Sequence, residues 1–120
     1  MKKVLIIDDS PFIAKEISGI IEGKGYEIIG HARNGESGIE MLEKLNPDII
    51  TLDIIMPGID GIETAGEILK RKPKMKIVML SSLCDYDTMQ DIKAIGIEHL
   101  VAKPIEPDKL LSVLDELSNS

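Results

Sequence analysis

The sequence contains few cysteines, few aromatic residues and no excess of positive charge. Its single cysteine, Cys84, rules out an internal disulfide and fits a reducing compartment. Aromatic residues make up only 2% of the 120 residues and tryptophan is absent, so aliphatic side chains must build the core. Acidic residues outnumber basic ones by 21 to 14, a net charge of −7, which argues against direct binding to nucleic acid.

Long apolar segments are missing as well. No apolar run approaches the roughly 20 residues of a membrane-spanning helix, and the run after Lys3 is too short for a signal peptide. We therefore expect a cytoplasmic protein that makes no contact with a membrane. The length suits one domain, and 43% hydrophobic with 29% charged residues is typical of a globular chain.

The sequence does contain a regular alternation of strand and helix patterns. Short continuous apolar runs predict buried strands, and apolar residues at helical spacing predict the helices between them. The predicted strands are Lys3–Asp8, Tyr26–Ala32, the run from Ile49 that ends at Asp53, Lys76–Ser81 and Glu98–Lys103. The predicted helices are Pro11 to about Glu22, Gly35 to just before Pro47, Gly61–Arg71, Asp85–Ile95 and Pro107–Leu117.

Five strand–helix units in strict alternation predict an α/β fold. We expect a (βα)5 doubly wound five-stranded parallel sheet, with right-handed crossovers and helices on both faces. Runs that are apolar throughout suit strands that are buried on both faces. Five strands favour the flavodoxin-like order 2-1-3-4-5, in which the first and third strands are neighbours at the switch point. Ligands of such sheets bind outside the carboxyl ends of the strands, so the site is expected at that edge.

Polar residues stand at the carboxyl ends of four of the predicted strands. These are Asp8 and Asp9 at the end of the first strand, Asp53 at the third, Ser81 and Ser82 at the fourth, and Lys103 at the fifth. In a parallel sheet these ends share one edge, so three carboxylates should crowd one crevice beside a hydroxyl and an ammonium group. Crowded carboxylates repel one another, and Mg²⁺, which prefers oxygen ligands, would relieve that repulsion. This combination suits phosphoryl transfer to a nucleophilic aspartate.

In this order and spacing the residues resemble the receiver domain of two-component response regulators. The resemblance covers essentially the whole chain, residues 1–120, through the fragments VLIIDDS, LDIIMPGIDG, MLSS and AKP. As a stand-alone receiver, the chain is most similar to the chemotaxis (CheY-like) type. The resemblance implies a phosphorelay signalling protein that is not an enzyme in its own right. Such a protein catalyses only its own Mg²⁺-dependent phosphorylation and dephosphorylation.

The resemblance also implies a role for each residue of the crevice. Asp53 would be the phosphoacceptor, taking a phosphoryl group from a histidine kinase or a phosphotransfer protein. Asp9 and Asp53, with the backbone carbonyl of Ile55, would bind Mg²⁺, and Asp8 would help through water.

Switching roles follow from the same resemblance. Lys103 would pair with the phosphoryl group, and the Lys103–Pro104 peptide bond would be cis. Ser81 would be the switch hydroxyl. An output protein, for example a component of the flagellar switch, would bind the face formed by the fourth helix, the fifth strand and the fifth helix.

The sequence departs from the family at four positions around the crevice. Three residues before Lys103 the family usually has an aromatic ring, whereas this chain has Leu100, so we expect activation without a rotating ring. Ile55 and Leu83 are apolar where the family often has polar residues that influence attack by water. We therefore expect a long-lived acyl phosphate. Ser82 stands where the family more often has alanine.

Three other interpretations compete with this one. A haloacid-dehalogenase-like phosphatase would need a second acid two residues after its nucleophile, where Ile55 stands. A flavodoxin would need a phosphate-binding loop after the first strand and aromatic residues to stack on the flavin. The chain could also be the N-terminal receiver fragment of a larger multidomain regulator.

His31 and His99 are isolated, without ligand spacing, so neither is expected to hold a metal, and Cys84 is expected to be an ordinary thiol.

Overall fold

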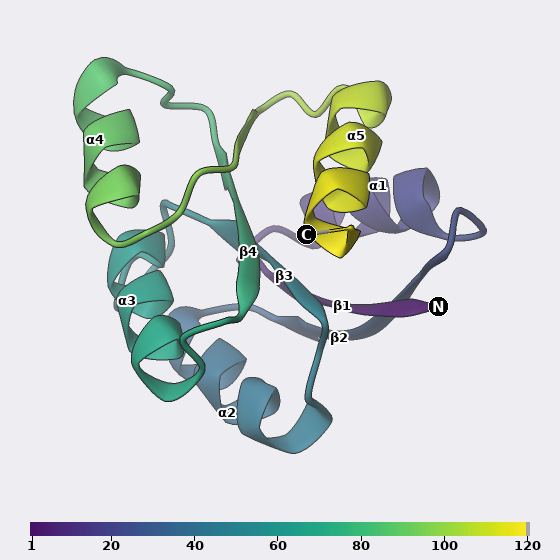
Figure 1. Cartoon of the computed structure of the whole chain (residues 1–120), viewed down its shortest axis with the longest axis horizontal. Helices are drawn as coiled ribbons and strands as arrows, with labels where there is room; N and C mark the ends of the chain where they lie inside the picture. Colours follow the sequence, from purple (N-terminus) through teal and green to yellow (C-terminus); the bar gives the residue numbers. More distant parts are fainter. Residues whose placement is uncertain (120) are drawn as a thin grey trace.

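Strands and helices alternate through residues 1–119, which a computed structural model describes (Figure 1). The strands are β1 (Lys2–Ile7), β2 (Tyr26–Ala32), β3 (Ile49–Asp53), β4 (Lys76–Ser81) and β5 (Leu100–Ala102). The helices are α1 (Pro11–Ile21), α2 (Gly35–Leu45), α3 (Gly61–Arg71), α4 (Tyr86–Ala94) and α5 (Pro107–Ser118). All strands pair in parallel in the order β2-β1-β3-β4-β5, which confirms the predicted topology.

Helices begin where the sequence supplies a cap. Four helices start at a polar side chain that accepts a backbone N–H of the first turn, which would otherwise lack a partner. The caps and their donors are Ser10 with Ile13, Asn34 with Ser37, Asp60 with Glu63, and Asp85 with Thr88. The predicted cap at Ser10, with proline at the first helical position, is confirmed.

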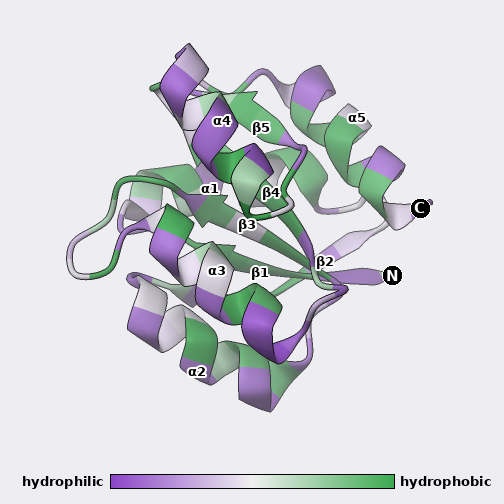
Figure 2. Cartoon of the chain, turned by 60° about the vertical axis from the view of Figure 1, so that its left-hand side comes forward, coloured by the Kyte–Doolittle hydropathy of each residue, from purple (hydrophilic) through white to green (hydrophobic). Residues whose placement is uncertain are grey.

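The sheet is covered on both faces. Helices α1 and α5 lie on one face, and α2, α3 and α4 lie on the other (Figure 1). Successive residues of a strand point to opposite faces, so each strand contributes to both clusters. In β1, for example, Ile6 packs with the α1–α5 cluster and Leu5 with the other. The central part of the sheet is therefore mainly hydrophobic, whereas β1 begins with two hydrophilic lysines (Figure 2). Within residues 1–119, no helix is both long and apolar enough to span a bilayer.

The fifth strand is shorter than predicted. We expected Glu98–Lys103, but only Leu100–Ala102 forms a ladder with β4. The strand lies at the edge of the sheet with β4 as its neighbour, so its length depends on that ladder and not on its own composition. Leu100 is consequently only partly buried, although an apolar residue in this run was expected to be buried.

One buried hydroxyl in the apolar core lacks a hydrogen-bond partner in the described part of the chain. Thr51 in β3 is fully buried, and its hydroxyl has no hydrogen-bond partner within residues 1–119. We expect Thr51→Val to raise the free energy of unfolding by about 1 kcal/mol, because burial of an unpaired hydroxyl costs about 1–3 kcal/mol. Urea unfolding measures this difference.

Thr64 provides the matched control for that substitution. It is equally buried, but its hydroxyl donates to the backbone carbonyl of Asp60 at 2.7 Å. Thr64→Val should therefore lower the free energy of unfolding. If Thr51→Val were destabilising to the same extent, the hydroxyl of Thr51 would have a stabilising role and the expectation would be wrong.

Candidate functional site

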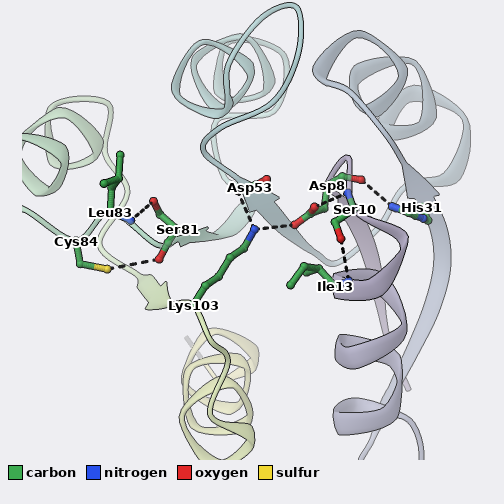
Figure 3. A network of polar contacts seen from close by, with 9 residues as sticks. All are labelled: Asp8, Ser10, Ile13, His31, Asp53, Ser81, Leu83, Cys84 and Lys103. Carbon is green, nitrogen blue, oxygen red and sulfur yellow. Dashed lines mark hydrogen bonds and ion pairs between the residues drawn. The ribbon is translucent and has the colours of Figure 1, made fainter.

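Four strands bring their polar ends to one edge of the sheet (Figure 3). Because Ile7 of β1 pairs with Leu52 of β3, the residues that follow them, Asp8 and Asp53, lie side by side. Asp8, Asp9 and Asp53 each offer one carboxylate oxygen, and these oxygens all lie within 4.8 Å of one another. The structure thus brings together the three carboxylates that the sequence placed in one crevice.

Lys103 lies between two of these carboxylates. Its Nζ is 3.1 Å from Oδ1 of Asp53 and 3.3 Å from Oδ2 of Asp8 (Figure 3). Asp8 is fully buried and Asp53 is only 5% exposed, so this ammonium compensates charges that water does not reach. One ammonium against three carboxylates leaves the crevice negative, which favours a further cation.

The environment of Asp53 disfavours its charge. Burial raises the pKa of its carboxyl above the ordinary value, and the charge of Asp8 raises that pKa further. The Lys103 ammonium and the backbone N–H of Ile55 act in the opposite direction without cancelling the effect. A cation or an electron-poor group placed beside such a carboxylate would stabilise its charged form. Carboxylates with a pKa shifted in this way are typical of functional sites.

The backbone around Asp53 is held by α3. The N–H of Gly61, the first residue of that helix, donates to the carbonyl of Ile54 at 2.7 Å. A Cβ on Gly61 would lie 2.1 Å from the carbonyl oxygen of Asp53, so only glycine allows this approach. The sequence marked Gly61 only as a helix start. Its packing role depends on where α3 meets β3, which the sequence does not show.

Ser81 lies at the same edge but faces the loop that follows β4. It is buried, and its Oγ accepts the backbone N–H of Leu83 at 2.8 Å (Figure 3). The thiol of Cys84 donates to the carbonyl of Ser81 at 3.6 Å. Within residues 1–119, no hydrogen bond joins the Ser81 hydroxyl to Asp53 or Lys103. The predicted switch hydroxyl is therefore near the crevice and is engaged by its own loop.

Large apolar side chains are exposed in the segments that follow β1, β3 and β4. They are Phe12, Ile55, Leu83 and Tyr86, with exposed fractions of 81%, 56%, 49% and 76%. Ile55 and Leu83 were expected beside the crevice from the sequence. The exposure of Phe12 and Tyr86 was not expected, because it cannot be deduced from one apolar residue in the first turn of a helix.

His31, for which no role was expected, contacts the end of β1. Its Nε2 lies 2.8 Å from the backbone carbonyl oxygen of Asp8 (Figure 3). No spacing rule predicts this contact, since it depends on the register between β1 and β2.

Residues 4–115 match the family described as the response regulator receiver domain. The chain belongs to this family. The chemotaxis protein CheY of Thermotoga maritima is 35% identical over 117 residues, which cover 98% of each chain. Among solved structures, the chemotaxis protein CheY4 of Vibrio cholerae is 29% identical, with a TM-score of 0.90 and 98% of each chain covered. The CheY of a Borrelia burgdorferi CheX–CheY–BeF3–Mg²⁺ complex is 31% identical, with a TM-score of 0.92, covering 98% of this chain and 89% of that one.

Membership in this family identifies a two-component signalling protein homologous to CheY. The family resemblance and the fold expected from the sequence are both confirmed. The Lys103–Pro104 bond is cis, as the resemblance implied. The phosphatase and flavodoxin interpretations do not agree with a receiver match over residues 4–115.

Proposed function

We propose that this receiver takes a phosphoryl group from a phosphohistidine onto Asp53, with Mg²⁺ bound beside it. The observation that carries the proposal is the position of the Lys103 ammonium within a group of three carboxylates at the edge of the sheet. In the reaction, the P–N bond of the donor breaks as an oxygen of Asp53 forms a new P–O bond, and the imidazole of the donor leaves. Catalysis of this kind requires positioning and charge stabilisation more than covalent chemistry.

The contacts of the three aspartates favour Asp53 as the acceptor. Both oxygens of Asp8 are engaged, Oδ1 by the backbone N–H of Ser10 at 2.8 Å and Oδ2 by Lys103. Asp9 is exposed and has no ion pair within residues 1–119. Asp53 combines a small exposed area with the ammonium that would stabilise the incoming phosphoryl oxygens.

The donor set suits Mg²⁺. The ion prefers carboxylate and carbonyl oxygens and uses one or two carboxylates together with water and a phosphate oxygen. Asp9 and Asp53 would hold it together with the backbone carbonyl of Ile55, and Asp8 would contribute through water. When bound, Mg²⁺ would neutralise charge on the phosphoryl group.

A small phosphodonor tests the proposal. Incubation of the protein with acetyl phosphate should add the mass of one phosphoryl group, only when Mg²⁺ is present, and hydroxylamine should remove it. Phosphomonoesters should not be turned over, because the proposed activity is limited to the protein's own phosphorylation and dephosphorylation. If no phosphoryl group is incorporated at any Mg²⁺ concentration, the proposal is wrong.

The upstream partner is proposed to be a histidine kinase or phosphotransfer protein in the cytoplasm. Its phosphohistidine must approach Asp53 closely, so its surface must cover the segments around the crevice. Phe12, Ile55, Leu83 and Tyr86 provide exposed apolar area there for that contact.

The downstream partner is proposed to bind the face formed by α4, β5 and α5. A cavity of about 430 Å³ opens on this face, lined by Met89, Leu100, Val113 and neighbouring residues. Leucine in place of a larger ring leaves room for an apolar side chain of the output protein. A component of the flagellar switch is one candidate, and no direct contact with nucleic acid is expected.

The acyl phosphate is expected to be long-lived for a receiver. Ile55 and Leu83 are apolar and exposed beside the crevice, and neither can orient a water molecule. We expect Ile55→Asn to accelerate release of phosphate by about 10-fold, below the 10²–10⁴-fold that a positioned general base can supply. Decay of the phosphorylated mass with time measures the rate. Leu45→Asn, a similar change at an exposed leucine at the end of α2, is the control; equal rates in Ile55→Asn and the parent would contradict the expectation.

Activation is expected to proceed through Ser81 rather than through Leu100. Leu100 has no polar tip and packs partly buried against the apolar cluster, so it gains nothing by moving into solvent. The Ser81 hydroxyl can instead turn from the N–H of Leu83 towards the phosphoryl group. NMR with and without beryllium fluoride tests this, with the buried Leu114 methyl groups as a reference. A rotamer change at Leu100 as large as the change at Ser81 would show that the leucine is the switch.

A further inference from the structure

His31 reaches from β2 to the end of β1. Its Nε2 lies 2.8 Å from the carbonyl oxygen of Asp8 (Figure 3). Because a carbonyl oxygen only accepts hydrogen bonds, Nε2 must carry the hydrogen and donate it. The imidazole is thus a fixed donor to a residue of the acidic crevice, although it takes no part in the proposed chemistry.

The contact stands where the ladder between β1 and β2 stops. The N–H of Asp8 still donates to the carbonyl of Ala32 at 2.9 Å. In a continued parallel ladder, the carbonyl of Asp8 would accept the backbone N–H of Asn34. Asn34 instead caps α2, so the backbone of this segment has left the sheet. The side chain of His31 supplies the hydrogen bond that the backbone no longer provides.

This carbonyl belongs to the planar peptide unit that joins Asp8 to Asp9. Its orientation therefore sets the direction in which Asp9 leaves β1. The side chain of Asp8 is held independently, by the N–H of Ser10 and by Lys103. The carboxylate of Asp9 has no hydrogen bond or ion pair among residues 1–119, so only the backbone places it.

We propose that His31 is a positioning residue of the metal site, which orients Asp9 through the Asp8–Asp9 peptide unit. The inference rests on the proposed function, since it concerns how the Mg²⁺ site is formed in advance of binding. His31 does not contact the metal or the reacting atoms. Its hydrogen bond lowers the cost of ordering Asp9 when the ion binds.

Loss of the His31 N–H should weaken Mg²⁺ binding more than it affects the phosphorylation of Asp53. Partners that hold metal ligands in place typically contribute about 10–100-fold to metal affinity. We expect His31→Leu, which keeps the apolar bulk and removes the N–H, to raise the Kd for Mg²⁺ by about 10-fold. Isothermal titration calorimetry of the whole chain with MgCl₂ measures this value.

Two further variants separate positioning from a general effect on folding. His31→Gln carries an amide N–H at the same number of bonds from Cβ, so it should recover most of the affinity. His99→Leu removes the other histidine, whose Nε2 lies 3.6 Å from Glu116, and should leave the affinity unchanged. The gain in unfolding free energy on adding Mg²⁺ should fall in His31→Leu and return in His31→Gln, whatever the stability of each variant without metal.

The proposal is overturned if His31→Leu binds Mg²⁺ as tightly as the parent, or if His31→Gln binds as weakly as His31→Leu. Labelling by acetyl phosphate at saturating Mg²⁺ should be normal in His31→Leu, and a reduced rate there would also contradict a purely positioning role. A parent protein that neither binds Mg²⁺ nor becomes phosphorylated would instead refute the proposed function. The two failures are therefore distinguishable.

Discussion

Asp53→Asn is expected to abolish phosphorylation by acetyl phosphate completely. An amide is not a nucleophile, and the two remaining aspartates are not expected to replace Asp53. Asp8 is fully buried with both oxygens engaged, and Asp9 makes no ion pair within residues 1–119. Intact mass measurement detects the phosphorylated form. Asp91→Asn, the same change at an exposed position of α4, should be labelled like the parent. Undiminished labelling of Asp53→Asn would refute the assignment of the acceptor.

The loss of phosphorylation in Asp53→Asn should not be caused by unfolding of the variant. Burial and the charge of Asp8 raise the pKa of Asp53, so the folded state holds the proton more tightly than the unfolded state. The stability that this proton contributes is lost as pH rises from the ordinary value through the raised one. Without Mg²⁺ at neutral pH, Asp53→Asn should therefore be more stable than the parent in urea unfolding. The difference should shrink as pH falls towards about 4, where the parent carboxyl also becomes neutral.

Asp9→Ala is expected to cause the second large effect, a loss of Mg²⁺ affinity. Asp9 is proposed to bind the ion directly, and even partners outside the first coordination sphere contribute about 10–100-fold, so the Kd should rise by at least about 10-fold. Calorimetric titration with MgCl₂ measures the change. Phosphorylation at low Mg²⁺ should fall in parallel, because the ion neutralises charge on the transferred group.

Folding is not expected to limit the Asp9→Ala experiment. Asp9 is exposed and outside the apolar clusters, so its removal relieves repulsion from Asp8 and Asp53 without opening a cavity. The matched control is Asp91→Ala, which removes an exposed carboxylate of α4 that is not in the group of three and should keep the parent affinity. Unchanged binding in Asp9→Ala would show that the ion, if bound, is held without Asp9.

Much of the fold could be predicted because its determinants are local. Apolar runs, helical spacing and caps such as Asn34 act within a few residues of the chain, and strict alternation then restricts the topology to very few arrangements. The ends of β5 were the main error. A strand at the edge of a sheet pairs with one neighbour, so its length depends on β4 rather than on its own composition.

The candidate site could be predicted as a group but not in its internal contacts. The carboxyl ends of parallel strands share an edge, which is enough to bring Asp8, Asp53 and Lys103 together. The orientation of Ser81 towards Leu83 depends on the path of one loop. The sequence offered no signal for that path.

The sequence by itself determined which elements form, their order and the chemical types collected at the edge of the sheet, because periodicity and strand polarity are properties of the chain. Only the tertiary structure decided that Gly61 packs on the carbonyl of Asp53, that His31 donates to Asp8, and that the hydroxyl of Thr51 is buried without a partner in the part of the chain described. Each of these three features depends on how atoms from different strands and helices are placed relative to one another. Their distances follow from strand register and helix packing, which arise only when the whole chain folds.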